Sequence, residues 1–246
     1  MTTAIGIKTN LGIERIVIAA DNQLTISSGQ FEFEKWPRKK IYTGDFWAMA
    51  FAGVYSKEVS RFFGKLKGYK NYYSSPEKSK EIIESALSRN PRRMIEVDTL
   101  NAEILSKGGS IQDTLSFIFA VNNPKLMLFV IDEYGNLKDI PEQEDFDYVC
   151  IGSGSDLAKK YIKECISSGS LDVEKITIRE AILVSLGALR NARNDIYTGS
   201  EIDWVVLSKE GIYDCGESIR RNIDETYKKL VEDQIKRFEL TPLTES

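Results

Sequence analysis

Apolar runs separated by turn residues divide the chain into strands and helices. Two runs rich in Ile, Val and Ala, at residues 2–8 and 13–20, are separated by Asn10 and Gly12 and predict two strands joined by a short turn. A third run, FWAMAFA at residues 46–52, is short and bounded by glycines. It predicts a buried strand.

Helical spacing of apolar residues follows this strand. Val59, Phe62, Phe63 and Leu66 predict a helix over residues 56–67. Pro76 suits the first turn of a second helix over 77–87, and 93–107 is expected to continue in helix. The same patterns predict further elements downstream: strands at 114–121, 126–131, 148–151, 204–207 and 211–213, and helices at 155–167, 177–193 and 218–238.

The order of these elements is strands, two helices, strands, two helices, strands. This order predicts an α+β fold and not the strict strand–helix alternation of a parallel sheet. Two antiparallel sheets between two helix pairs, a four-layer αββα sandwich, would bury the apolar strands on both faces. We expect this domain to span residues 1–215, followed by a C-terminal helix and tail at 216–246.

Composition restricts the kinds of binding partner and the cellular compartment that we expect for this protein. The formal net charge of −4 gives no global field that would attract nucleic acid. No apolar run reaches membrane-spanning length, and the first residues do not show the basic-then-apolar pattern that is typical of a signal segment. The three cysteines, Cys150, Cys165 and Cys215, form no C-x-x-C pair, which favours a reducing compartment. We expect a cytoplasmic protein that binds neither nucleic acid nor membrane.

The chain contains no histidine. Catalytic triads and metal sites that depend on imidazole are therefore excluded. We expect no metal and no cofactor. A catalytic base must come from Lys, Asp, Glu, Tyr or a terminal amine.

The chain begins Met1-Thr2-Thr3. A small second residue allows an aminopeptidase to remove Met1, which leaves Thr2 with a free α-amine beside its own hydroxyl. Nucleophile and base then belong to one residue. A free α-amine has a pKa near ~7.7–8.0, so it accepts a proton near neutrality. An ordinary exposed terminus is the alternative interpretation.

Four further sites could carry chemistry, and each has an ordinary interpretation as well. Asp21 ends an apolar strand and Lys40 precedes the next one, so they form either a buried charge pair or a turn residue and a surface cation. Residues 152–155, Gly-Ser-Gly-Ser, lie between a strand and a helix and suit a tight turn and helix cap. Residues 194–199, NDIYTG, suit a helix end.

Taken in order, these short motifs resemble the proteasome β-subunit family and the bacterial ATP-dependent peptidase that shares its fold. The matching segments are Thr-Thr-Ala-Ile-Gly at 2–6, Ala-Ala-Asp-Asn-Gln-Leu-Thr at 19–25, Lys-Lys-Ile at 39–41, Phe-Ala-Gly at 51–53, Gly-Ser-Gly-Ser at 152–155 and Asp-Ile-Tyr-Thr-Gly at 195–199. The resemblance covers about residues 2–215. It implies an N-terminal nucleophile (Ntn) hydrolase fold and a threonine peptidase.

The resemblance also implies a role for each matching residue. The catalytic set is Thr2 as nucleophile, Asp21 and Lys40 as the charge pair that tunes it, the Gly53 N–H as oxyanion donor, and Ser153, Asp195 and Thr198 as the groups that hold the α-amine and a water. The substrate-binding set is Thr25, which pairs its backbone with an extended peptide, and the pocket residues Leu24, Phe51 and Tyr55.

Some positions depart from the family pattern. The three pocket residues are bulky where the family often has small ones, which implies a preference for a small residue beside the cut. Thr198 replaces the commoner Ser, and Ser200 stands where a second Gly is usual. Activation is expected to rely on Met1 removal alone.

The resemblance implies a homo-oligomeric ring that encloses its sites, acts on peptides or unfolded proteins, and works with an ATPase unfoldase. Two other interpretations stay open. One is an Ntn hydrolase that cleaves a small amide or transfers a peptide to an amine. The other is a non-catalytic structural subunit of a ring, although such a subunit typically carries an extra N-terminal helix over the site.

Overall fold

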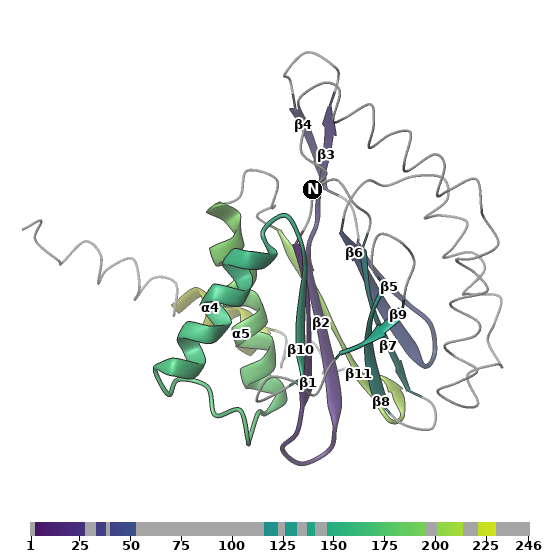
Figure 1. Ribbon diagram of the computed structural model, residues 1–246, viewed down its shortest axis with the longest axis vertical. Helices are drawn as coiled ribbons and strands as arrows, with labels where there is room; N and C mark the ends of the chain where they lie inside the picture. The colour runs from purple at the N-terminus through teal and green to yellow at the C-terminus, as the bar shows by residue number, and fades with distance from the viewer. Residues whose placement is uncertain are drawn as a thin grey trace, which may run out of the picture. The chain divides into compact units, whose positions relative to one another are not determined.

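Most of the described strands in the first part of the chain form two five-stranded antiparallel sheets (Figure 1). The computed structural model describes residues 3–27, 33–37, 40–52, 116–122, 126–131, 137–140, 147–194, 201–213 and 221–229. Contacts divide the chain into two units, Met1–Tyr213 and Asp214–Ser246. Each unit is described by itself, and the predicted domain boundary at residue 215 remains a prediction.

The first sheet contains Asp21, and one of its strands ends directly before Ser153, so it positions two residues of the predicted catalytic set. Its strand order is β10-β1-β2-β11-β12, with β1 Thr3–Thr9, β2 Arg15–Asp21, β10 Tyr148–Gly152, β11 Ile202–Ser208 and β12 Gly211–Ile212. β1 pairs antiparallel with β2, and Gly12 in the turn between them has a φ of 79°. This left-handed conformation favours glycine. The predicted hairpin is therefore confirmed.

The second sheet has the strand order β5-β6-β7-β8-β9. Its strands are β5 Ile41–Thr43, β6 Trp47–Ala52, β7 Ser116–Asn122, β8 Leu126–Ile131 and β9 Leu137–Asp139. A separate hairpin consists of β3 Gln23–Ser27 and β4 Phe33–Pro37. The sequence analysis missed β3, β4 and β9, because these short strands contain no continuous apolar run.

The core lies between the two sheets. Small and branched side chains fill it, among them Ala4, Ile18, Ala50, Ile118 and Leu128. At Gly6, a Cβ atom would lie only 3.0 Å from side-chain carbons of Ile118 and of Leu128. Glycine at this position therefore lets the two sheets approach closely.

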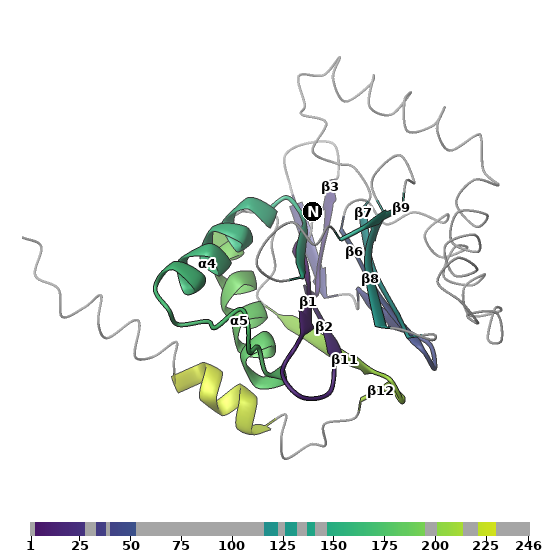
Figure 2. The same cartoon turned by 60° about the horizontal axis from the view of Figure 1, so that its bottom comes forward.

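Two helices cover the other face of the first sheet, so that the sheet lies between them and the second sheet (Figures 1 and 2). These are α4 Ser155–Ser167 and α5 Ile178–Asn191, which a short 3₁₀ turn follows. At the start of α5, Thr177 and Glu180 form a reciprocal capping box. This box satisfies two backbone N–H groups that the helix itself leaves unpaired.

The mixed α+β composition and the two antiparallel sheets confirm the predicted class. The helices predicted at 56–67, 77–87 and 93–107 lie outside the described residues. Of the final helix expected at 218–238, residues 221–229 are described and are helical. Within the described ranges, no helix combines the length and apolar character needed to cross a bilayer.

Candidate active site

A buried ion pair joins the two sheets near the beginning of β1. Nζ of Lys40 lies 3.4 Å from Oδ1 of Asp21, and the two side chains are 1% and 0% exposed. Asp21 is the last residue of β2, and Lys40 directly precedes β5. Isolated charges are costly to bury, so each side chain requires the other at this place.

The second oxygen of Asp21 binds the start of the chain. The backbone N–H of Thr3 donates to Oδ2 of Asp21 at 2.6 Å, and this contact is buried. The Thr3 nitrogen is the amide that links Thr3 to residue 2. The ion pair therefore holds the peptide bond that follows residue 2, and residue 2 itself lies outside the described residues.

Burial changes the proton affinity of Lys40. Desolvation lowers the pKa of its ammonium from 10.5 to about 8, although the charge of Asp21 acts in the opposite direction. A cation with this pKa stays protonated at neutral pH and titrates just above it. Its positive field would lower the proton affinity of a neighbouring amine.

The turn between β10 and α4 reaches the same place from the other side of β1. Gly152 pairs in register with Thr3, and its φ of 96° turns the chain out of β10. Two residues later, the N–H of Gly154 donates to Oγ of Thr3 at 3.2 Å. Ser153, which is half-buried, lies between these two glycines and so beside the beginning of β1.

The structure thus brings together three of the predicted segments: Asp21, Lys40 and the turn with Ser153. It adds Thr3, which the sequence analysis did not single out, although it is the second Thr of the opening motif. Four predicted catalytic residues lie outside the described residues: Thr2, Gly53, Asp195 and Thr198. The catalytic role of every residue in the set remains a prediction.

The predicted substrate-binding residues are only partly described. Leu24 and Thr25 lie in β3, where Thr25 pairs in register with Lys35. Phe51 lies in β6, is 0% exposed, and packs against the ring of Tyr42 at a centroid distance of 6.3 Å. Tyr55 lies outside the described residues.

Other reactive side chains lie away from this place or in unreactive surroundings. Cys150 and Cys165 are free thiols, and burial raises the pKa of Cys150 to about 12. Cys215 lies outside the described residues. Among the residues that the structure describes, no three Cys, Asp or Glu side chains are grouped so that they could hold a metal ion.

Solved structures share this fold, whereas no protein-family model and no curated protein sequence matches the chain. HslV from Trypanosoma brucei aligns with a TM-score of 0.56 and 20% identity over 84% of this chain and 99% of that chain. A mutant of Anbu from Hyphomicrobium sp. strain MC1 aligns with a TM-score of 0.64 and 16% identity over the full length of both chains. Both are proteasome-like, so the resemblance drawn from the sequence motifs is confirmed at the level of the fold.

Proposed function

We propose that this chain, which has the fold of HslV and Anbu, is an N-terminal threonine hydrolase that cleaves amide bonds of peptides through an acyl-enzyme. Thr2 is its nucleophile once Met1 has been removed. One observation carries the proposal: Asp21, buried in an ion pair with Lys40, accepts the N–H of Thr3, the residue that follows the proposed nucleophile.

The charges around this amide suit the chemistry of an N-terminal nucleophile. The hydroxyl of Thr2 attacks the scissile carbonyl, and its own α-amine accepts the hydroxyl proton through a water and passes it to the amine that leaves as the amide bond breaks. A second water then hydrolyses the ester, which releases the acid and restores the Thr2 hydroxyl. Lys40 stays protonated at neutral pH and favours the neutral amine and the developing alkoxide. Asp21 compensates the buried charge of Lys40 and holds the adjoining peptide plane.

The remaining roles follow the family resemblance. Ser153, Asp195 and Thr198 hold the α-amine and the water. The N–H of Gly53 stabilises the oxyanion, a contact typically worth about 10²–10³ in rate. The backbone of Thr25 pairs with an extended substrate. The pocket residues are Leu24, Phe51 and Tyr55.

The likeness to proteasome-like proteins supports an assembly in which the sites are enclosed. We propose a four-layer αββα subunit in a cytoplasmic homo-oligomeric ring. A shell of this kind admits unfolded chains, which an ATPase unfoldase would supply. Size-exclusion chromatography with light scattering measures the number of subunits directly, and a monomer at micromolar concentration would contradict the ring.

The nucleophile is tested by intact mass spectrometry with and without a peptide epoxyketone, a reagent that reacts with both hydroxyl and amine of an N-terminal threonine. We expect the wild-type chain to lack Met1 and to gain one adduct. Thr2→Ala is the matched control, because alanine also permits Met1 removal but has no hydroxyl. Thr2→Ser retains both groups and is expected to react.

Three outcomes separate the alternatives. A wild-type chain that keeps Met1, or an adduct that persists in Thr2→Ala, contradicts the proposed nucleophile. A correctly processed chain that forms no adduct favours the structural subunit. A reactive chain that joins peptides to an added amine instead of releasing acids is a transferase, and product analysis with a peptide panel distinguishes the two.

A further inference from the structure

Thr3 makes buried hydrogen bonds to two different parts of the proposed site, Asp21 and the turn at Gly154. Its backbone N–H donates to Oδ2 of Asp21 at 2.6 Å, and its Oγ accepts the N–H of Gly154 at 3.2 Å. The side chain is 0% exposed. Thr3 therefore links the Asp21–Lys40 pair to the turn that carries Ser153.

The contact with Gly154 fixes the turn between β10 and α4 at the residue where the helix begins. Gly154 is the residue that caps α4, and it has no side chain with which to fix that end of the helix. Its N–H is buried, and a buried donor requires an acceptor. Since Oγ of Thr3 supplies that acceptor, it sets how closely the turn approaches the first residues of β1.

We propose that Thr3 is a positioning residue for the hydrolysis proposed above, on which this inference rests. Its hydroxyl holds the turn of Ser153 against the beginning of β1, and its N–H fixes the peptide plane that follows Thr2. Both contacts orient the nucleophile and its amine, and neither touches the substrate. Loss of the hydroxyl therefore lowers kcat and leaves KM nearly unchanged.

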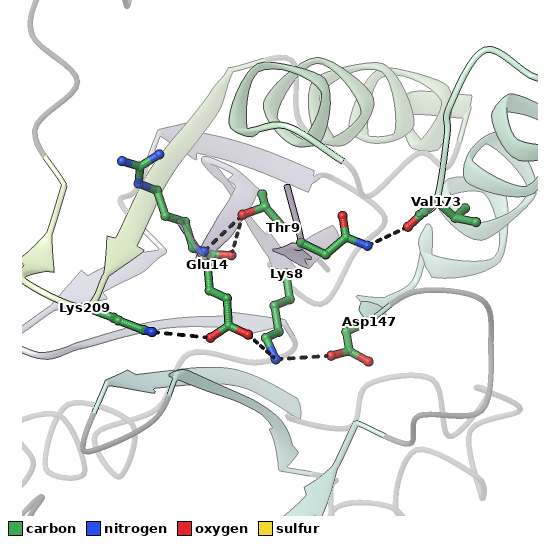
Figure 3. Close-up of polar contacts among 8 residues, drawn as sticks. Lys8, Thr9, Glu14, Asp147, Val173 and Lys209 are labelled. Carbon is green, nitrogen blue, oxygen red and sulfur yellow. Dashed lines mark hydrogen bonds and ion pairs between the residues drawn. The ribbon is translucent and has the colours of Figure 1, made fainter. Parts of the chain in front are cut away.

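A purely structural role is the competing explanation, and β1 contains a matched control. Thr9 is the other buried threonine of β1, six residues later and so on the same face of the strand. Its Oγ accepts the N–H of Arg15 at 3.0 Å and donates to the Arg15 carbonyl at 3.3 Å (Figure 3). Thr9 thus resembles Thr3 in burial and bonding, but it lies at the other end of the strand.

The test compares Thr3→Val, Thr3→Ser and Thr9→Val with the wild-type full chain. We measure kcat and KM on a fluorogenic peptide, the rate of epoxyketone adduct formation at Thr2, and hydrogen exchange of residues 152–155. Thr3→Val is expected to lower kcat and the adduct rate about tenfold to a hundredfold, because a misplacement of about 1 Å can cost on the order of a hundredfold. The backbone amides of residues 152–155 are also expected to exchange hydrogen faster in this variant than in the wild type.

Thr3→Ser keeps the oxygen and is expected to restore most of the rate, whereas Thr9→Val is expected to leave kcat unchanged. A Thr3→Val chain as active as the wild type overturns the inference, and so do equal losses in Thr3→Val and Thr9→Val. A wild-type chain that forms no Thr2 adduct instead contradicts the proposed hydrolase. In that case, faster hydrogen exchange of residues 152–155 in Thr3→Val still supports the contact between Thr3 and the turn, whereas unchanged exchange overturns it.

Discussion

Nζ of Lys40 lies 3.4 Å from Oδ1 of Asp21, and the pair connects the end of β2 in one sheet with the beginning of β5 in the other. Both charged side chains are almost completely shielded from water. A buried ion pair gains little or nothing over well-packed apolar side chains, so its energetic contribution to the fold is small. The pair is better explained by the field that it creates beside the first residues of β1.

Removing one member of this pair is expected to destabilise the fold more than removing both. Lys40→Met leaves the Asp21 carboxylate buried without its cation, which typically lowers the free energy of unfolding by about 3–5 kcal/mol. The double variant Asp21→Asn, Lys40→Met is expected to recover part of this loss. Urea unfolding measures all three free energies.

An exposed ion pair provides the control for this experiment. Lys160 and Glu164 lie one turn apart on α4, and their side chains are 71% and 63% exposed. Lys160→Met is expected to change the free energy of unfolding little, because water screens such pairs. A Lys40→Met chain as stable as Lys160→Met would contradict the buried pair.

The pKa of Lys40 predicts how stability depends on pH. Burial lowers this pKa from 10.5 to about 8 in the folded chain. Between these two values the unfolded chain binds more protons than the folded chain, so the contribution of Lys40 to the free energy of unfolding rises with pH. Well below about pH 8 both states are protonated and the contribution is constant.

Urea unfolding at several values from pH 7 to 10 measures this dependence. The difference between the wild type and Lys40→Met isolates the contribution of Lys40, because the other titrating groups are common to both chains. We expect that difference to grow in favour of the wild type above about pH 8. A difference that stays flat or shrinks over the same range would contradict a lowered folded pKa, because a pKa raised above 10.5 leaves Lys40 protonated in both states over almost all of it.

Gly211 is expected to tolerate no side chain. Its φ is 112°, and a Cβ atom there would lie 2.5 Å from the backbone oxygen of Asp45. Gly12 is the matched control, since its φ is 79° and nothing lies within 4 Å of its Cβ position. Gly12→Ala is expected to cost about 1–2 kcal/mol from the left-handed backbone alone.

Gly211→Ala should cost clearly more, because a backbone atom cannot move aside as a flexible side chain can. The shift in thermal midpoint of the two variants compares them directly. Equal shifts would mean that Gly211, the first residue of β12, does not lie against the backbone of Asp45 between β5 and β6.

Cys150 is expected to be unreactive in the folded protein. Its side chain is 5% exposed, and burial raises its pKa to about 12, so almost no thiolate is present at neutral pH. Iodoacetamide at pH 7.5 should modify Cys150 in urea but not in the native chain, as peptide mass spectrometry would record. Cys150→Ser should leave the Thr2 adduct intact, whereas rapid native labelling would refute the buried position.

Elements with strong local patterns were predictable from the sequence. The helix at 155–167 and the strand at 126–131 have the predicted bounds. β1 and β2 differ from their predicted bounds by one or two residues at each end, and β6 differs by one residue at its start. Their apolar periodicity is a local property of the chain. The β3–β4 hairpin was missed because its pairing depends on register between two short segments that are not continuously apolar.

The sequence alone determined the chemistry that is available: no imidazole, a threonine that follows Met1, and an acid and a lysine at strand ends in a family-like order. Only the tertiary structure decided that Lys40 is buried against Asp21 and not exposed, and that Thr3 meets Gly154, 151 residues away. Such contacts depend on how two sheets and a helix pack together. Packing is a long-range property that no local pattern of residues specifies.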